Sequence, residues 1–432
     1  MGSVAPKVPA FSASMPVPVL DARDSLHTIV PQILNHKIAY YFKILFIFHY
    51  VYSMIERILA ERISGKAGRG KAIIIIGPRQ VGKTTLIKKL LRNERYQFFD
   101  GDDPRIRTLL DTPNTDQIRA FIGDHKVVFI DEAQRINNIG LTMKIIIDQL
   151  KDVQLWISGS SSFSLFNELN EPLTGRKWEY ELFPISWEEF EHHVGFIEAD
   201  QQLERRLVYG MYPDVINNPN EEPEILGNLV SSYLYKDVLS YAGIRKPQVL
   251  DKLIQALALQ IGSEVRYNEL SQLVGVDRNT IEKYITILEQ GYVVFRLPSF
   301  NRNVRNEIKK GRKIYFYDNG IRNAVIGAMD HLALRSDVGQ LWENFLISER
   351  IKMNKYKFTL AKSFFWRTNQ QQEIDYVEQR GLNLKAYEFK WNPNKKVKIS
   401  TTFTKAYDAE GFLINRENFR AFVTIVRGKN DA

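Results

Sequence analysis

Short, unbroken runs of apolar residues separate helical patterns in the first part of the chain. Residues 72–76, 127–130 and 154–157 are such runs, and each is followed by polar or glycine-rich residues. Runs of this length that are rich in β-branched side chains are typical of strands buried on both faces of a parallel sheet. The pattern predicts an α/β fold class, with a parallel sheet and its helices between residues 54 and 190.

Helical spacing dominates the next segment. Residues 191–245 contain Glu-rich and Tyr- and Leu-rich stretches that favour helices, with breaks expected at Pro213 and at 217–223. We expect this segment to form a helical lid on the α/β core.

The pattern changes again between residues 246 and 313. It predicts helices at 267–274 and 278–288, with Asp277 as the N-cap of the second, and a strand pair that begins at 291. Helix, turn, helix and strand in this order are typical of a winged helix-turn-helix, whose second helix can enter the major groove of DNA.

A DNA-binding interpretation of this module gives roles to its basic and polar residues. Arg278, Asn279 and Lys283, at the start of the second helix, would face the major groove. A basic wing would contact phosphates through Arg302, Arg305, Lys309, Lys310, Arg312 and Lys313. The alternatives are a module that contacts another protein and a run of charges that is only solvated.

The last segment, residues 314–432, predicts a smaller α/β domain with a group of acids. A helix carries Glu343, one strand carries Asp375, and alternation places Glu388 and Lys390 on one face of the next strand. Asp375 and Glu388 would hold Mg²⁺, with Glu343 as a further ligand. Lys390 would position or activate a water molecule, as in metal-dependent nucleases. The alternative is a structural cluster of salt bridges without nuclease activity.

Composition narrows the chemistry. The 432 residues include no cysteine, which excludes disulfides, thiolate zinc sites and a cysteine nucleophile and predicts a cytoplasmic protein. Lys and Arg number 59 against 50 Asp and Glu, and the net charge of +9 fits a nucleic-acid partner without requiring one.

The N-terminal extension, residues 1–53, differs from the rest. Its apolar run at 38–52 contains Lys43 and His49 and is shorter than a membrane span, so we expect no integral membrane segment. The run could form a membrane-surface or partner-binding helix, or a buried one. We favour a buried helix, or translated sequence that lies ahead of a native start at Met54, over a membrane or partner contact. A peptide covering 38–52 in mass spectra of the native protein would contradict that start.

A glycine-rich loop follows the first apolar run. The loop matches G-x-x-x-x-G-K-[ST], with Gly77, Gly82, Lys83 and Thr84 at the fixed positions. Pro78, Arg79, Gln80 and Val81 occupy the variable positions between the glycines. Backbone N–H groups of such a loop surround the phosphates of ATP, and the helix that starts near Thr85 would point its positive end at them. Lys83 would add a point charge, and the Thr84 hydroxyl would ligate Mg²⁺.

Two acids follow the second apolar run. Asp131 and Glu132 stand where a parallel strand reaches its carboxyl edge, which is where ligands bind in α/β sheets. Asp131 would hold Mg²⁺, and Glu132 would orient and deprotonate the attacking water. The alternatives are a solvated acidic turn and, for the whole loop, a metabolite kinase, although no acceptor site is evident.

Two further residues are candidates for the same reaction. Ser160 follows the third apolar run and could sense the γ-phosphate, although any serine of 158–162 would fit a plain loop as well. Arg176 could act as an arginine finger across the interface of a homo-oligomer, or it could be a surface arginine.

Several segments together resemble bacterial and archaeal AAA-type ATPases that carry a C-terminal domain of unknown function. They are residues 77–85, 129–134, 157–161, 173–176, 183–190 and 209–214. The resemblance extends from about residue 54 to the end and implies ATP binding, with no assigned physiological role. Residues 335–400 resemble the PD-(D/E)xK restriction-endonuclease fold, although Ile374 replaces the proline before Asp375.

Two functions follow as expectations. One is an ATPase coupled to DNA-binding and nuclease modules. The other is an ATP-driven regulatory or scaffold protein whose C-terminal modules bind a protein partner.

Overall fold

The computed structural model describes residues 54–111, 113–159, 173–231, 247–301, 311–368, 370–395 and 399–424. The extension at 1–53 lies outside the described residues. So do five predicted site residues: Ser160, Arg302, Arg305, Lys309 and Lys310. Residues 54–432 form one compact unit. In the described part of the chain, no helix is both long and apolar enough to cross a membrane.

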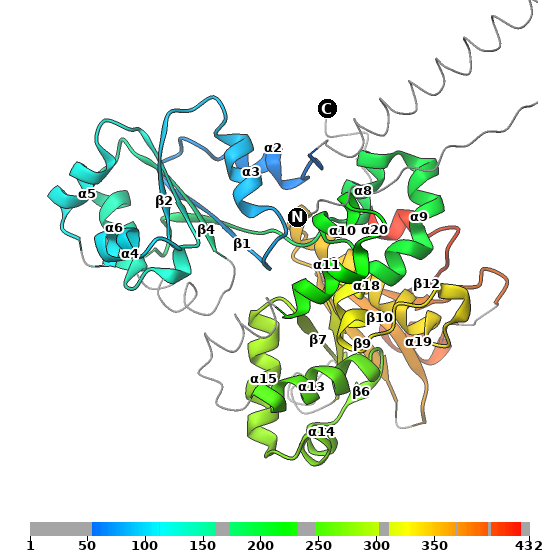
Figure 1. Ribbon diagram of the computed structural model, residues 1–432. Helices are drawn as coiled ribbons and strands as arrows, with labels where there is room; N and C mark the ends of the chain where they lie inside the picture. Colours follow the sequence, from blue (N-terminus) through cyan, green and yellow to red (C-terminus); the bar gives the residue numbers. More distant parts are fainter. Residues whose placement is uncertain are drawn as a thin grey trace, which may run out of the picture. The chain divides into compact units, whose positions relative to one another are not determined.

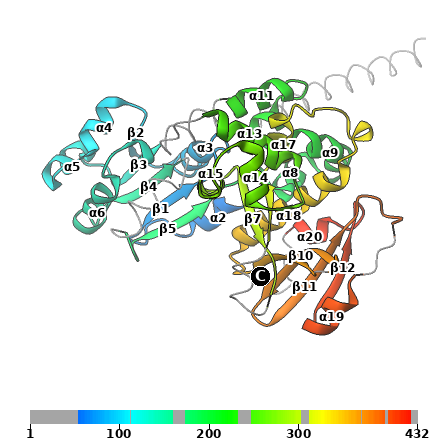
Figure 2. The same cartoon turned by 90° about the horizontal axis from the view of Figure 1, so that it is seen from below.

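A five-stranded parallel sheet forms the first part of this unit, in the order β2-β3-β4-β1-β5 (Figure 2). The strands are β1 (Ala72–Ile76), β2 (Tyr96–Asp100), β3 (Val127–Asp131), β4 (Gln154–Gly159) and β5 (Lys177–Glu181). Every residue of β1 and β3 is buried, as their unbroken apolar runs require. The predicted parallel sheet is therefore present, and β4 lies between the two strands that carry the motifs.

Helices accompany this sheet. They are α2 (Leu59–Ser64), α3 (Lys83–Leu90), α4 (Pro104–Asp111), α5 (Thr115–Ile122), the 3-10 turn η1 (Ala133–Arg135) and α6 (Ile139–Gln149). α4 and α5 both contact α6, and the three form one group in Figure 1. Asn114 and Gln117 form a capping box that starts α5, because each side chain accepts a hydrogen bond from the other residue's backbone N–H.

The segment predicted as a lid is helical. Its described helices are α8 (Trp187–Val194), α9 (Phe196–Tyr209), α10 (Pro213–Asn217) and α11 (Glu222–Leu229). Ser186 and Glu189 form the capping box of α8, so helical structure begins before the predicted boundary at 191. Both predicted breaks lie between helices: α9 ends before Pro213, which is the first residue of α10, and the gap between α10 and α11 falls within 217–223.

The next elements follow the predicted order of helices and strands. They are α13 (Pro247–Leu259), β6 (Glu264–Val265), α14 (Tyr267–Val274), α15 (Arg278–Gln290), β7 (Val294–Pro298) and β8 (Arg312–Phe316). Asp277 caps α15, as expected, by accepting a hydrogen bond from the Thr280 N–H at 3.0 Å. β8 pairs with both β6 and β7, so it crosses the predicted boundary at residue 313.

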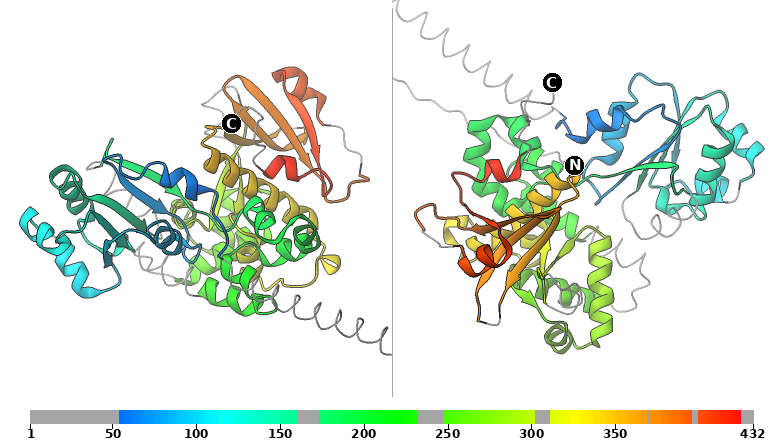
Figure 3. Two further views of the ribbon diagram at one scale, coloured as in Figure 1. Left: turned by 90° about the horizontal axis from the view of Figure 1, so that it is seen from above. Right: turned by 180° about the vertical axis from the view of Figure 1, so that it is seen from behind.

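The C-terminal part contains a second, four-stranded sheet in the order β12-β11-β10-β9 (Figure 3). Its elements are α17 (Asn319–Val325), η3 (Leu332–Leu334), α18 (Val338–Lys357), β9 (Lys362–Arg367), β10 (Glu373–Arg380), β11 (Asn383–Phe389), α19 (Thr401–Tyr407), β12 (Glu410–Ile414) and α20 (Arg420–Val423). The register between β9 and β10 shifts between Ile374 and Val377. Such irregularities redirect side chains, and Asp375 lies within this one.

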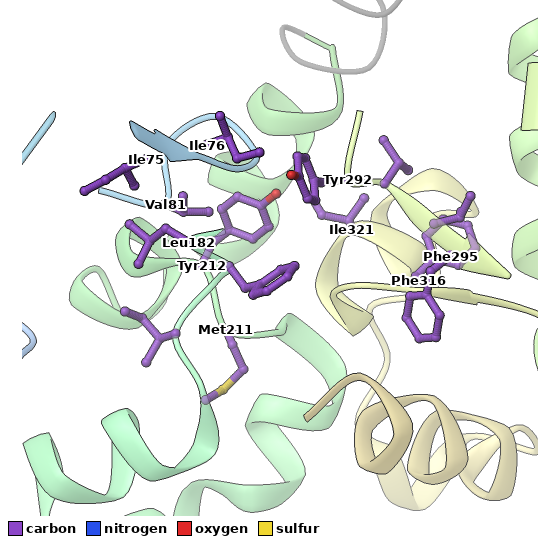
Figure 4. Packing of buried hydrophobic residues seen from close by; sticks show 14 of the residues in the cluster. Ile75, Ile76, Val81, Leu182, Met211, Tyr212, Tyr292, Phe295, Phe316 and Ile321 are labelled. Carbon is purple, nitrogen blue, oxygen red and sulfur yellow. The ribbon is translucent and has the colours of Figure 1, made fainter. Parts of the chain in front are cut away.

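One cluster of buried apolar side chains runs through these parts. It includes Ile76 before the glycine-rich loop, Val81 within that loop, Leu182 after β5, Tyr212 before α10, and Tyr292 before β7 (Figure 4). A smaller cluster fills the space between the four-stranded sheet and α19. The shared core explains why the segments after residue 190 do not form separate units.

Candidate nucleotide site and a second acidic pocket

The loop between β1 and α3 depends on two glycines. Gly77 has φ +151°, and a side chain there would place its Cβ 2.0 Å from the Leu182 carbonyl oxygen. Gly82 has φ +92°, a left-handed conformation that L residues rarely adopt, and it precedes the first residue of α3. Gly77 is therefore required because a side chain would collide with the backbone at Leu182. Gly82 is required because of its left-handed backbone conformation.

Three polar side chains meet at the carboxyl edge of the sheet. The Lys83 Nζ donates to the carbonyl oxygens of Gly77 at 3.0 Å and Pro78 at 2.7 Å. The Thr84 Oγ1 lies 2.8 Å from the Asp131 Oδ2 and 3.0 Å from its Oδ1. The two motifs that the sequence placed at one site are thus in direct contact.

Ser158 is a member of this site that the sequence did not single out. Its hydroxyl donates to the Asp131 Oδ1, and the side chain is fully buried. The register pairs Ile130 with Ile157, so the next residue of each strand lies at the same edge. The signal was the position of Ser158 at the end of an apolar run, whereas the prediction chose Ser160 from the same stretch.

Glu132 adopts an unusual backbone conformation, with φ +47°. Its Oε2 accepts a hydrogen bond from the Gln134 Nε2 at 2.5 Å. Non-glycine residues with positive φ cost about 1–3 kcal/mol and are concentrated at functional sites. The hydrogen bond from Gln134 orients the Glu132 carboxylate directly after Asp131, which suits a base that accepts a proton from a positioned water molecule.

Arg176 does not lie at the nucleotide site of its own chain. Its carbonyl oxygen accepts a hydrogen bond from the Ala72 N–H at 3.0 Å, at the start of β1, whereas the loop follows the end of that strand. Its Nε pairs with the Asp148 Oδ1 at 2.6 Å, at the end of α6. A role across an interface with a second copy stays a prediction.

A cavity of about 590 Å³ adjoins the glycine-rich loop. Its walls come from the segment before α2, from the loop and α3, and from α8 and α10. The residues include Arg57, Ile58, Val81, Gly82, Thr85, Leu86, Glu188, His192, Pro213 and Asn217. Cavities of this size hold small organic ligands, and this one is partly apolar.

The four predicted nuclease residues line a second pocket of about 650 Å³. The Lys390 Nζ lies 3.7 Å from the Asp375 Oδ2 and 3.4 Å from the Glu388 Oε2. The Phe389 N–H donates to the Asp375 Oδ2 at 2.8 Å. Glu343 reaches the same pocket from α18, so residues from three elements meet as the strand pattern predicted.

Lys313 was wrongly predicted to contact DNA phosphates from a wing. Its side chain is only 2% exposed, and its Nζ lies 3.2 Å from the Glu343 Oε1 and 2.5 Å from the Glu373 Oε1. Tyr315 donates to the same oxygen of Glu343 at 2.5 Å. β8 continues past residue 313, the predicted end of the winged helix-turn-helix, and places Lys313 next to Glu343 and Glu373.

Glu343 is also not the third ligand of a preformed metal site. Over the described ranges, no group of three or more Asp, Glu, His or Cys side chains is arranged to hold a metal ion. Glu343 bonds to Lys313 and Tyr315 instead. Asp375 and Glu388 are the two predicted metal ligands that remain.

Burial and charge set the ionisation of this pocket. Burial raises the pKa of Glu343 to about 7, although Lys313 opposes the shift. Burial and the Asp375 carboxylate raise the pKa of Glu388 to about 8. Burial alone would lower the pKa of Lys313, but Glu343, Glu373 and Asp375 outweigh it and raise that pKa.

The predicted major-groove residues are accessible. Arg278, Asn279 and Lys283 are all exposed on the first turns of α15. Arg312, predicted in the wing, instead donates to the Tyr267 hydroxyl at 3.2 Å. Exposure permits the predicted DNA contact without testing it.

Comparison with protein families divides the chain into three. Residues 69–191 match the AAA domain family. Residues 200–332 and 338–427 match two families, each described as a domain of unknown function (DUF8612 and DUF4143).

Two relatives of the chain are described only as uncharacterized proteins. An uncharacterized protein of Mycobacterium tuberculosis is 28% identical over 334 residues, which are 76% of this chain and 72% of the relative. An uncharacterized protein of Methanocaldococcus jannaschii is 23% identical over 344 residues, 74% of this chain and 75% of the relative. Among solved structures, the Walker-type ATPase PABY2304 of Pyrococcus abyssi aligns with 63% of this chain and 96% of its own, at 14% identity and a TM-score of 0.46. The AAA domain match supports a P-loop ATPase core of the AAA type that binds ATP.

Proposed function

We propose that this protein is a Mg²⁺-dependent ATP hydrolase. The observation that carries the proposal is the contact between the Thr84 hydroxyl and the Asp131 carboxylate, 2.8 Å apart beside Lys83. A hydroxyl and a carboxylate are the oxygen donors that Mg²⁺ takes at nucleotide sites. Mg²⁺ held by Thr84 and Asp131 would neutralise phosphate charge.

The surrounding residues have separate tasks. Lys83 places an ammonium group against the outer phosphates, and Ser158 orients the Asp131 carboxylate by donating to the Oδ1, while the Thr84 hydroxyl contacts both oxygens. Glu132, oriented by Gln134, accepts a proton from the attacking water. The adjoining cavity of about 590 Å³, whose lining includes His192 and Pro213 as well as loop residues, would receive the nucleoside.

The test is an assay of ATP turnover by the full chain with Mg²⁺ and with EDTA. We expect turnover that requires Mg²⁺ and is lost in Lys83→Ala, while Lys144→Ala, at an exposed lysine of α6, retains it. Turnover in Lys83→Ala equal to that of the wild type would contradict the proposal.

A coupled DNA function is the second candidate. Arg278, Asn279 and Lys283 favour it because they are exposed at the start of a capped helix that follows a turn. A winged helix-turn-helix that binds duplex DNA would stimulate ATP turnover when DNA is added. Indifference to DNA would favour the regulatory or scaffold function.

Nuclease activity is the less favoured part of that candidate. Lys313 already balances the charge of Glu343 and Glu373, which favours a pocket without a preformed metal site. Metal-dependent DNA cleavage that disappears in both Asp375→Ala and Lys390→Ala would establish the nuclease. Cleavage that persists in both variants would remove these residues from consideration.

A further inference from the structure

Arg57 is a buried cation next to the glycine-rich loop. Its side chain is 6% exposed, and its Nε lies 3.1 Å from the Glu189 Oε1, in a side chain that is fully buried. The backbone N–H of Ile58 donates to the same oxygen at 2.9 Å. A buried ion pair is costly to form unless its remaining donors are also satisfied, so the other partners of Arg57 matter.

Those partners are two backbone carbonyls, one in the glycine-rich loop and one in the chain after β5. The Arg57 Nη1 donates to the Val81 oxygen at 2.7 Å, and its Nη2 donates to the Phe183 oxygen at 2.6 Å. Because a trans peptide is planar, the carbonyl of Val81 and the N–H of Gly82 point in opposite directions. Holding the Val81 oxygen on Arg57 therefore turns the Gly82 N–H away from Arg57, as a phosphate-binding loop requires.

The same guanidinium also contacts the C-terminal part of the chain. The Tyr356 hydroxyl, on α18, accepts hydrogen bonds from the Arg57 Nη2 at 3.3 Å and from the Phe183 N–H at 3.1 Å. Tyr356 thus bonds both to the arginine that holds the loop and to the chain that leaves β5.

α18 repeats this contact along one face. The Glu349 Oε2 accepts from the Trp187 N–H at 2.6 Å, and the Lys352 Nζ donates to the Ile185 oxygen at 3.3 Å. Residues 349, 352 and 356 share a helix face, and their partners 187, 185 and 183 follow in the reverse order along the chain. The helix is therefore bonded at three successive points to the chain between the end of β5 and the first residue of α8.

We infer that Arg57 is a positioning residue for the glycine-rich loop, and that Tyr356 makes this positioning depend on helix α18. The inference rests on the proposed ATPase function. It gives the C-terminal part of the chain a role at the ATP site that requires no chemistry of its own. α18 also carries Glu343, thirteen residues before Tyr356. At 1.5 Å per residue, the second pocket and the ATP site are linked by about 20 Å of one helix.

The test compares three variants of the full chain. Tyr356→Phe removes only the hydroxyl. Arg57→Lys keeps the charge but loses the planar fork that bonds Val81, Phe183 and Glu189 together. Arg350→Lys is the matched control, because Arg350 also lies on α18 and forms a buried pair with Glu378 at 2.7 Å, but its hydrogen bonds go to Glu378 and Phe422 and not to the loop. The measurements are KM and kcat for ATP and the midpoint of thermal unfolding.

We expect Tyr356→Phe to raise KM for ATP about two- to tenfold, the effect of one or two lost hydrogen bonds, while kcat changes less than KM. Arg57→Lys should raise KM further. Arg350→Lys should lower the unfolding midpoint and leave KM unchanged, which separates loop positioning from general destabilisation.

Two results would overturn the inference. One is unchanged KM and kcat in folded Tyr356→Phe and Arg57→Lys. The other is a rise in KM in Arg350→Lys as large as that in Tyr356→Phe. If the wild type hydrolyses ATP and both Tyr356→Phe and Arg57→Lys have the same KM and kcat as the wild type, this inference is wrong and the proposed function stands. A wild type that neither hydrolyses ATP nor binds it in calorimetric titration defeats the proposed function as well.

Discussion

The two acidic sites of this protein differ in where their balancing charge comes from. At the nucleotide site, Asp131 contacts two hydroxyls, and the nearby cation, Lys83, is bonded to backbone carbonyls. In the second pocket, the carboxylates already face two lysines. The first site holds its cation against the loop where phosphates would bind, whereas the lysines of the second pair with carboxylates of the protein itself.

The largest expected effect comes from removing the lysine of the second pocket. Lys313→Met leaves Glu343 and Glu373 without their shared cation, and breaking such a buried pair costs about 3 kcal/mol or more. Urea unfolding measures the loss, and Lys395→Met, at an exposed lysine of the same pocket, is the control. A loss below about 1 kcal/mol, as for an exposed pair, would show that the acids do not depend on Lys313.

At the nucleotide site, the corresponding change affects rate rather than stability. Glu132→Gln keeps the size of the side chain but removes the base, and we expect kcat for ATP to fall at least about 100-fold with binding retained. Glu94→Gln, at an exposed glutamate of the same core, should have no effect. Wild-type turnover in Glu132→Gln would assign water activation to another group.

A smaller effect concerns Asp337, whose pKa is lowered, whereas the pKa values of Glu343 and Glu388 are raised. Burial opposes ionisation of Asp337, but Arg335 and Arg322 outweigh it and lower its pKa to about 2. The stability that Asp337 contributes is therefore present above its ordinary pKa near 3.8 and is lost as the pH falls towards 2. Asp337→Asn should flatten this part of the curve of unfolding midpoint against pH. An unchanged slope between pH 4 and pH 2 would contradict the assignment.

The smallest expected effect is on DNA binding. If Lys283 faces the major groove of duplex DNA, Lys283→Ala should weaken binding and, because it removes one cation from the interface, reduce the salt dependence by up to about one counterion. Fluorescence anisotropy at several salt concentrations measures both, and Lys252→Ala on α13 is a comparison at another lysine. Affinities that do not change in Lys283→Ala would leave α15 without a role in DNA contact.

The sequence predicted that the glycine-rich loop and the acidic pair meet, because each motif is built from contiguous residues. The loop at 77–84 and the pair Asp131 and Glu132 each follow a buried strand, and parallel strands bring such ends together. Ser158 was missed among several serines because only the register shows which one reaches Asp131. Strand alternation also brought Asp375, Glu388 and Lys390 to one pocket.

Contacts between distant segments could not be predicted in the same way. Lys313 reads as one member of a basic run, and only the pairing of β8 with β6 and β7 shows that it points inward. Arg57 and Tyr356 are separated by 299 residues, and neither lies in a motif. Their meeting depends on how the helices pack, which no local pattern records.

The attachment of α18 to the segment between β5 and α8 has a practical consequence for dissecting the protein. The three matched families suggest cutting the chain near residues 195 and 335. A fragment that ends there would keep every nucleotide-binding motif but would lose the side chains that bond to the backbone at Phe183, Ile185 and Trp187. Low solubility or weak activity of such a fragment would then report a missing structural partner, and a chain that begins at Met54 and retains α18 is the smaller version to express first.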